Sequence, residues 1–192
     1  MKKISLIIIG AAVVAGFFFL RPTEIINYPS AGTDVIAFGD SLTAGVGSSR
    51  GEGFVKMITD DIDLPIINLG VSGDTTEAAL NRVMQLDNYD PKIVILLLGG
   101  NDYLAGVPKE KTLENLAKII DEIHKRGAVV LLLGLDEAYE DLAEEKKSAY
   151  VPDILGGIFG KEALMSDGLH PNDRGYKMMA ERVKPALKEL ID

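Results

Sequence analysis

The chain has 192 residues and a formal net charge of −9 at pH 7, with no cysteine and two histidines. Its length predicts one domain that can bury a full hydrophobic core. The missing cysteines exclude disulfides, thiolate metal sites and cysteine nucleophiles, and two histidines disfavour a multi-histidine metal site. The acidic balance argues against a nucleic-acid partner, because phosphate backbones favour a basic protein face.

Residues 1–21 have the pattern of a signal or membrane anchor. Lys2 and Lys3 precede an uncharged stretch from Ile4 to Leu20, which Arg21 ends. A basic start before an apolar run is typical of a secretory signal, and the run is just long enough to span a bilayer. No Ala-x-Ala cleavage site follows the phenylalanines, which favours an uncleaved anchor over a signal removed on secretion. Because lysines stay in the cytoplasm, we expect an extracytoplasmic protein, periplasmic or at the cell surface.

Residues 22–32 contain two prolines and a glycine and are predicted to form a linker before a domain at 33–192. Within that domain, apolar stretches of strand length alternate with stretches of helical periodicity. Strands are predicted at 35–38, 65–69, 93–98 and 128–133, and the irregular region after residue 152 allows a short strand near 163–165. Helices are predicted near 54–62, 74–84, 108–126, 136–149 and 172–191.

Two features mark where helices begin. Asp74 is predicted to cap its helix, with Glu77 completing a capping box, and Asn172 or Asp173 is predicted to cap the last helix. Strands alternating with helices predict a doubly wound α/β domain, a three-layer α/β/α sandwich around a mostly parallel sheet.

Four polar clusters interrupt this apolar framework, at residues 39–41, 70–74, 99–102 and 167–171. The first three each follow a predicted strand. Carboxyl ends of parallel strands meet at one edge of the sheet, where ligands bind, so these three clusters should lie together. The fourth, just before the last helix, has to reach the same edge if its histidine is to act there.

The residue types in these clusters suit acyl transfer by a serine. A serine hydroxyl is a weak nucleophile until an oriented base removes its proton, and Ser41 would need such a base. Asp167 and His170 lie three residues apart, so the carboxylate can hold the imidazole. The N–H groups of Ser41 and Gly73 and the side-chain amide of Asn101 can donate to a developing oxyanion.

Three other polar residues have structural interpretations. Asp40 is expected to accept N–H bonds from its own loop. Asp102 is the rival of Asp167 as partner of the histidine, but we expect it to cap a helix or brace a loop. His124, beside Lys125 and Arg126 on a predicted helix, is expected to be solvated.

With these clusters in order, the chain resembles the GDSL, or SGNH, hydrolase family of serine esterases and lipases. Ser41, Gly73, Asn101 and His170 match the four letters of the second name, and residues 68–76 are similar to the branch with acyl-CoA thioesterase I, lysophospholipase and arylesterase activities. The resemblance implies a flavodoxin-like sheet, with Ser41 as nucleophile, His170 as base and Asp167 as its partner. It also implies an oxyanion hole of Ser41, Gly73 and Asn101, and no cofactor or metal.

The resulting expectation is a serine hydrolase that cleaves a small acyl-ester, thioester or lipid-like substrate through an acyl-enzyme. An alternative with the same chemistry is an O-acetyl esterase of cell-envelope polysaccharide, which the absence of tryptophan makes less favoured, since aromatic platforms bind sugars. A third alternative is a non-catalytic extracytoplasmic binding domain on a hydrolase framework. The chain is short after Leu135 for this branch, so the acyl length is not carried over.

Overall fold

The structure is a computed structural model that describes residues 24–191. The predicted anchor at residues 1–21 lies outside this range. Across residues 24–191, no helix combines the length and the apolar character needed to cross a bilayer.

Five parallel strands form one sheet in the order β2-β1-β3-β4-β5. The strands are β1 (Asp34–Gly39), β2 (Ile66–Gly70), β3 (Pro91–Leu97), β4 (Val129–Leu133) and β5 (Ala149–Val151). Chain order differs from sheet order because the chain crosses from the β2 edge back over β1 to reach β3. This doubly wound order confirms the predicted α/β class.

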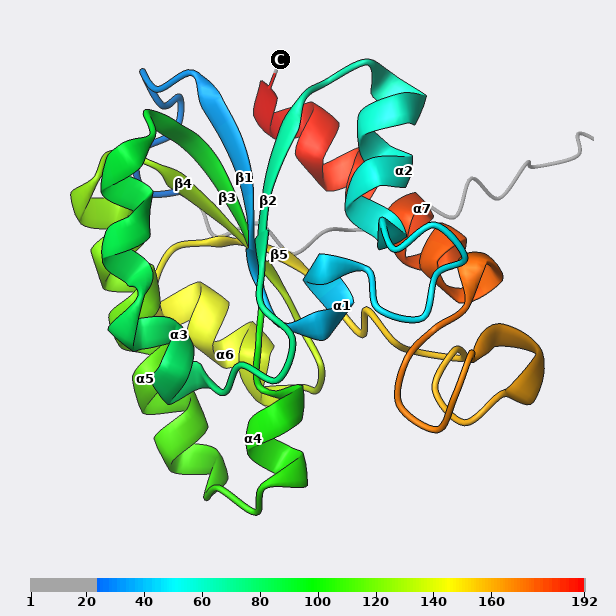
Figure 1. The fold of residues 1–192 in the computed structure, drawn as a ribbon. Coiled ribbons are helices and arrows are strands. Elements are labelled where there is room, and N and C mark those ends of the chain that lie inside the picture. Colours follow the sequence, from blue (N-terminus) through cyan, green and yellow to red (C-terminus); the bar gives the residue numbers. More distant parts are fainter. Residues whose placement is uncertain (1–23, 192) are drawn as a thin grey trace, which may run out of the picture.

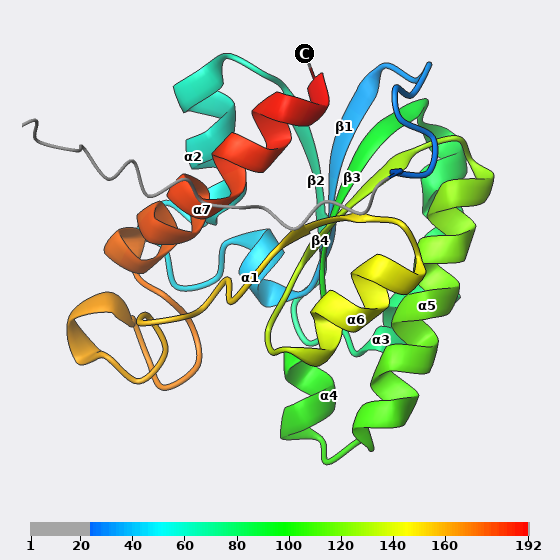
Figure 2. The same ribbon diagram turned by 180° about the vertical axis from the view of Figure 1, so that it is seen from behind.

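Helices cover both faces of the sheet, which makes three layers (Figure 1). One face is covered by α2 (Gly53–Ile62) and α7 (Asp173–Ile191), and Figure 2 shows these two helices and a second helical layer on opposite sides of the sheet. That second layer consists of α3 (Thr76–Asn81), the 3-10 helix η1 (Val83–Asn88), α5 (Lys109–Lys125) and α6 (Ala138–Glu145).

The long apolar runs of β1, β3 and β4 reflect burial of these strands on both faces of the sheet. In β1, Val35 and Ala37 face the layer of α2 and α7, while Ile36 and Phe38 face the layer of α5. The same alternation continues through β3 and β4. This packing fixes the strand ends, and with them the loops that follow at the carboxyl edge.

The predicted charged helix at 136–149 was wrong in extent. Helix α6 covers only residues 138–145, and Lys147, with φ of 49°, ends the helical stretch. Residues 149–151 then form β5, a strand that the sequence interpretation missed. The helix is also less superficial than its charges suggest, since Tyr139 and Leu142 are buried against the sheet.

The predicted start of the helix after β2 was one residue early. Thr75 is the N-cap, and its hydroxyl accepts the N–H of Ala78 at 3.3 Å. Asp74 forms an ion pair with Arg82 instead. The apolar residues that α3 and η1 bury are Ala79, Val83 and Leu86. At the last helix Asn172 is the cap, as predicted, accepting the N–H groups of Arg174 and Gly175.

Three smaller predictions can also be compared with the structure. Residues 162–164 form the 3-10 helix η2 (Glu162–Leu164) in place of a short strand, and Met165 makes only an isolated bridge to Pro171. His124 is half-buried rather than solvated, and burial lowers the pKa of its ring. Residues 24–32, predicted as a linker, hydrogen-bond to the domain, for example from Asn27 to the carbonyl of Ala128.

Candidate active site

Ser41 lies at the carboxyl edge of the sheet, where β1 turns directly into the short helix α1 (Ser41–Ala44). Asp40 caps this helix by accepting the N–H of Leu42 at 2.9 Å. The turn needs glycine at position 39, because a Cβ there would clash with the Thr43 side chain and the carbonyl of Leu97. Helix α1 therefore begins immediately after the strand and presents the Ser41 hydroxyl at the sheet edge.

His170 connects Ser41 to Asp167. Its Nε2 lies 3.1 Å from the Ser41 hydroxyl oxygen, and its Nδ1 lies 2.9 Å from Asp167 Oδ2. The other carboxylate oxygen of Asp167 accepts the N–H groups of Leu169 and His170, each at 2.7 Å. The three-residue spacing thus closes a turn that orients the ring, and the fourth polar cluster does reach the edge that carries Ser41.

The environment of Asp167 keeps its carboxylate charged. The hydrogen bond from the His170 ring, together with those from the backbone of Leu169 and His170, lowers the pKa of Asp167 to about 2. Asp167 is half-exposed, whereas the side chain of His170 is 19% exposed. A permanently ionised carboxylate favours the Nδ1–H tautomer, which leaves Nε2 free to accept a proton from Ser41.

Asn101 lies in α4 (Gly100–Leu104), which follows β3 at the same edge. Its side-chain amide donates to the carbonyl of Asp74 at 2.9 Å and also lines the cleft beside Ser41. Because an amide nitrogen carries two hydrogens, one N–H remains for a ligand. The bond to Asp74 fixes the direction in which that second hydrogen points.

Gly73 is held close to this group through its neighbours. Val71 donates to the carbonyl of Gly39 at 2.9 Å, and Asp74 accepts from Asn101, so residue 73 is placed between two anchored positions. Gly73 has φ of 86°, a conformation that favours glycine, and it does not line the cleft. The position of Gly73 near Ser41 is thus inferred from its neighbours, whereas Asn101 and His170 line the cleft together with Ser41.

Asp102 serves a structural purpose, as predicted. It is buried, and its two oxygens accept the backbone N–H of Thr76 at 2.8 Å and the Thr76 hydroxyl at 2.5 Å. These bonds brace the start of α3. The carboxylate that contacts His170 is Asp167.

Asp40 carries the buried carboxyl closest in sequence to Ser41. Burial, with a smaller contribution from the negative charge of Asp74, raises the pKa of Asp40 to about 6. An aspartate in the unfolded chain has a pKa of about 3.9. Between about pH 4 and 6, Asp40 is therefore mostly ionised in the unfolded chain and mostly protonated in the folded protein. Stability is therefore expected to decrease as pH rises from about 4 to 6.

We expect Asp40→Asn to remove this pH dependence while its amide oxygen still accepts the N–H of Leu42. The stability of the variant relative to the parent should rise by about 2 kcal/mol between pH 4 and pH 7. Urea unfolding of both proteins at several pH values measures this difference. Parallel stability curves would show that Asp40 ionises as easily in the folded chain as in the unfolded one.

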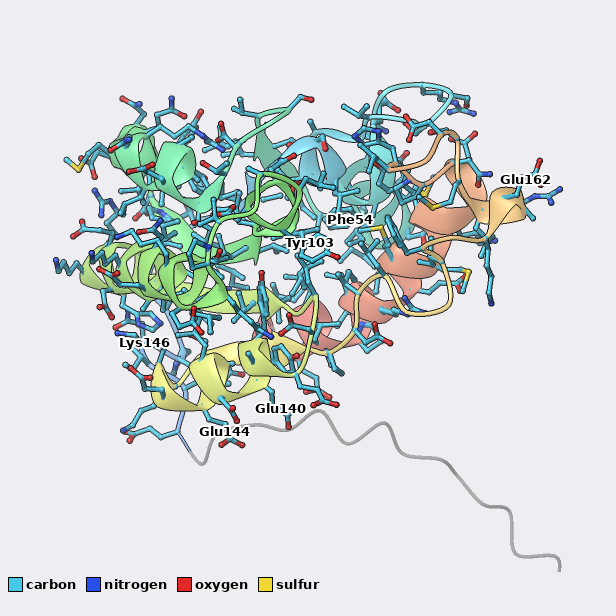
Figure 3. All side chains as sticks on the ribbon, turned by 90° about the horizontal axis from the view of Figure 1, so that it is seen from below. Phe54, Tyr103, Glu140, Glu144, Lys146 and Glu162 are labelled. Carbon is cyan, nitrogen blue, oxygen red and sulfur yellow. The ribbon has the colours of Figure 1, made fainter. Side chains whose placement is uncertain are left out.

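A cleft of about 570 Å³ extends from Ser41 and His170 across the carboxyl ends of β3 and β4. Much of its lining is apolar, and this part includes Val107, Leu113, Leu135, Leu155 and Phe159. Further apolar side chains that line it are exposed, with Tyr103 85% and Leu104 58% accessible. Figure 3 views this edge from below and labels Tyr103 near the centre, with Glu140 of α6 and Glu162 of η2 farther out.

Hydrogen bonds link Ser41 to His170 and His170 to Asp167, beside an apolar cleft on a doubly wound sheet. This arrangement is typical of a hydrolase site. The family described as GDSL-like Lipase/Acylhydrolase matches residues 37–136. The chain belongs to this family, which confirms the resemblance stated from the sequence.

Individual relatives extend the similarity over most of the chain. Esterase TesA of Pseudomonas aeruginosa is 31% identical, covering 87% of this chain and 94% of TesA. An arylesterase of Vibrio mimicus is 32% identical, covering 82% of this chain and 89% of its own. Among solved structures, one titled as the crystal structure of TesA matches with a TM-score of 0.77 at 30% identity, covering 82% of this chain and 99% of that one.

Sequence reasoning did not identify Arg82 and Tyr139, which support the site. Arg82 pairs with Asp74, and the Tyr139 hydroxyl donates to the carbonyl of Leu98 at 2.9 Å, just before α4. Neither residue lies in a polar cluster or follows a strand. Both residues fall within stretches predicted as helices, so the sequence does not separate them from ordinary surface or core residues.

Proposed function

We propose that the protein hydrolyses acyl esters or thioesters through an acyl-enzyme formed on Ser41. The observation that carries this proposal is the continuous chain of hydrogen-bond contacts from Ser41 through His170 to Asp167. A hydroxyl in contact with an oriented imidazole is the arrangement that nucleophilic catalysis by serine requires.

In the first half of the reaction, His170 Nε2 takes the Ser41 proton as the hydroxyl oxygen attacks the acyl carbonyl carbon. The negative charge that forms on the carbonyl oxygen is stabilised by the N–H groups of Ser41 and Gly73 and the amide of Asn101. Collapse of the tetrahedral intermediate breaks the ester or thioester bond, and His170 returns its proton to the leaving group.

In the second half, water replaces the leaving group. His170 takes a proton from the water, the resulting hydroxide attacks the acyl carbon, and the proton passes to the Ser41 oxygen as the acid departs. Asp167 stabilises the charged imidazole in both halves and stays ionised itself.

The apolar cleft supports an acyl chain as the part of the substrate that binds there. An acetyl group would leave most of about 570 Å³ unfilled, so the cleft favours longer acyl chains over the acetate of a polysaccharide. The relatives named esterase and arylesterase support ester substrates, and a further relative in Escherichia coli carries the name thioesterase 1/protease 1/lysophospholipase L1. Attachment to a membrane through residues 1–21 remains part of the proposal.

The test is hydrolysis of p-nitrophenyl esters from acetate to palmitate by the full chain in mild detergent. We expect the highest kcat/KM for an acyl chain longer than acetate. Activity confined to acetate would favour the O-acetyl esterase. A folded protein without activity on esters, thioesters or acetylated glycan would favour the binding domain.

Asn101→Ala removes one donor to the oxyanion, and kcat is expected to fall by about 10²–10³ with KM nearly unchanged. The amide acts mainly on the transition state, in which the oxygen carries its charge. Steady-state kinetics on one p-nitrophenyl ester measure the effect. Asn88→Ala is the control, because within residues 24–191 the exposed Asn88 amide hydrogen-bonds just the carbonyl of Gln85, on the surface of η1. A change in KM alone would assign Asn101 to substrate binding.

A further inference from the structure

Arg82 is a partly buried arginine outside the cleft lining that hydrogen-bonds both the end of β1 and the loop after β2. It lies where α3 passes into η1, and its side chain is 13% exposed. Its Nε donates to Asp74 Oδ2 at 2.5 Å, and its Nη2 donates to the carbonyl of Gly39 at 3.0 Å. The guanidinium also stacks on the ring of Phe38, 4.1 Å from the centroid.

Each partner of this guanidinium is next to a proposed oxyanion donor. Gly39 ends β1 two residues before Ser41, and Asp74 directly follows Gly73. The carbonyl of Asp74 also accepts from the side chain of Asn101 at 2.9 Å. One side chain therefore connects the strand end that carries the Ser41 N–H, the loop that carries the Gly73 N–H, and the residue that orients the Asn101 amide.

The loop needs such an anchor because it has little packing of its own. Residues 71–73 are exposed, and a Cβ placed on Gly73 would have no heavy atom within 4 Å. Its backbone contacts are the bonds from Val71 to Gly39 and from Asp74 to Val71. The Asp74 side chain, 11% exposed, is the part of the loop that is fixed by a charged partner.

We propose that Arg82 is a positioning residue that holds the three oxyanion donors in their mutual arrangement. This inference rests on the proposed function, since it needs an oxyanion at the site. Donors must lie within about 2.7–3.1 Å of the oxyanion, and a displacement of about 1 Å can cost a factor of about 10². Arginine suits the task because its planar fork bonds two acceptors at once while stacking on an aromatic ring.

The competing interpretation is that Arg82 only stabilises α3. Arg126 offers a matched control, because its side chain is also 13% exposed and is likewise held by ion pairing, with Asp87 at 2.7 Å and Glu122 at 3.0 Å. It follows the last residue of α5 and does not line the cleft. Both arginines can be replaced by methionine, which keeps the apolar stem.

We expect Arg82→Met to lower kcat by about 10–100-fold with KM within about twofold, at a temperature at which circular dichroism shows the variant folded. Arg126→Met should lose stability and keep its kcat. An unchanged kcat in folded Arg82→Met would overturn the proposal, as would a raised KM without a change in kcat.

Arg82→Lys provides a second variant if Arg82→Met does not fold. Lysine can pair with Asp74, but its single ammonium cannot reproduce the planar fork that also reaches Gly39. We expect kcat to be lowered by about tenfold or less, yet measurably, and a kcat equal to that of the parent would contradict the proposal. Ser41→Ala, measured alongside, distinguishes failure of the proposed function from failure of the positioning role. Full activity in Ser41→Ala would refute the proposed function. An inactive Ser41→Ala together with an Arg82 variant of normal kcat would refute only the positioning role.

Discussion

Ser41→Ala is expected to lower kcat for p-nitrophenyl ester hydrolysis by about 10⁴–10⁶, close to the background rate. The substitution removes the oxygen that would form the acyl-enzyme, and no water held by His170 can replace it with the same effective concentration. The loss should appear in kcat, because the apolar cleft proposed to bind the acyl chain is untouched. Stopped-flow and steady-state rates on one ester measure it.

A matched control for this variant is Ser30→Ala. The Ser30 hydroxyl donates to the carbonyl of Gly127 at 2.7 Å, at the other end of the domain, and its removal should leave kcat unchanged. A fluorophosphonate should label the parent and Ser30→Ala on one serine and leave Ser41→Ala unlabelled, as intact-protein mass spectrometry would show. Retention of most activity by Ser41→Ala would refute the acyl-enzyme mechanism.

The sheet was readable from the sequence because its central strands are buried on both faces. Six consecutive aliphatic residues from Ile93 to Leu98 admit few other interpretations in a chain of this length. The candidate site was readable for a related reason. Polar clusters directly after such strands have to meet at one edge, so the chain order and the topology together brought Ser41 and Asn101 to the same cleft.

The outermost strand on the β4 side of the sheet, β5, was less predictable. Strand β5 has three residues and pairs only with β4, so its sequence carries no long apolar run. Helix α6 before it is rich in charge, and the periodicity does not reveal that Lys147 turns the chain back with a positive φ. The difference between Asp74 and Thr75 as helix cap has a tertiary cause, since Arg82 draws the aspartate into an ion pair.

His170→Ala is expected to reduce kcat by about as much as Ser41→Ala, about 10⁴–10⁶. Without the imidazole, Ser41 keeps its proton at neutral pH and the leaving group receives none. His170 lines the cleft, so its removal leaves a space that solvent can enter, and added imidazole should restore part of the rate. His124→Ala is the control, because the other histidine of the chain lies near the end of α5, outside the cleft.

The double variant distinguishes a serine and a histidine that act together from two independent contributions. Because each proton transfer proposed for His170 accompanies the making or breaking of a bond to the Ser41 oxygen, Ser41→Ala/His170→Ala should be no slower than Ser41→Ala alone. Imidazole should also fail to rescue the double variant, since there is no hydroxyl for it to deprotonate. If the loss of background-corrected rate in the double variant equals the product of the losses in the two single variants, His170 acts on the substrate directly. The 3.1 Å contact between Nε2 and the Ser41 hydroxyl would then not be the route of the proton.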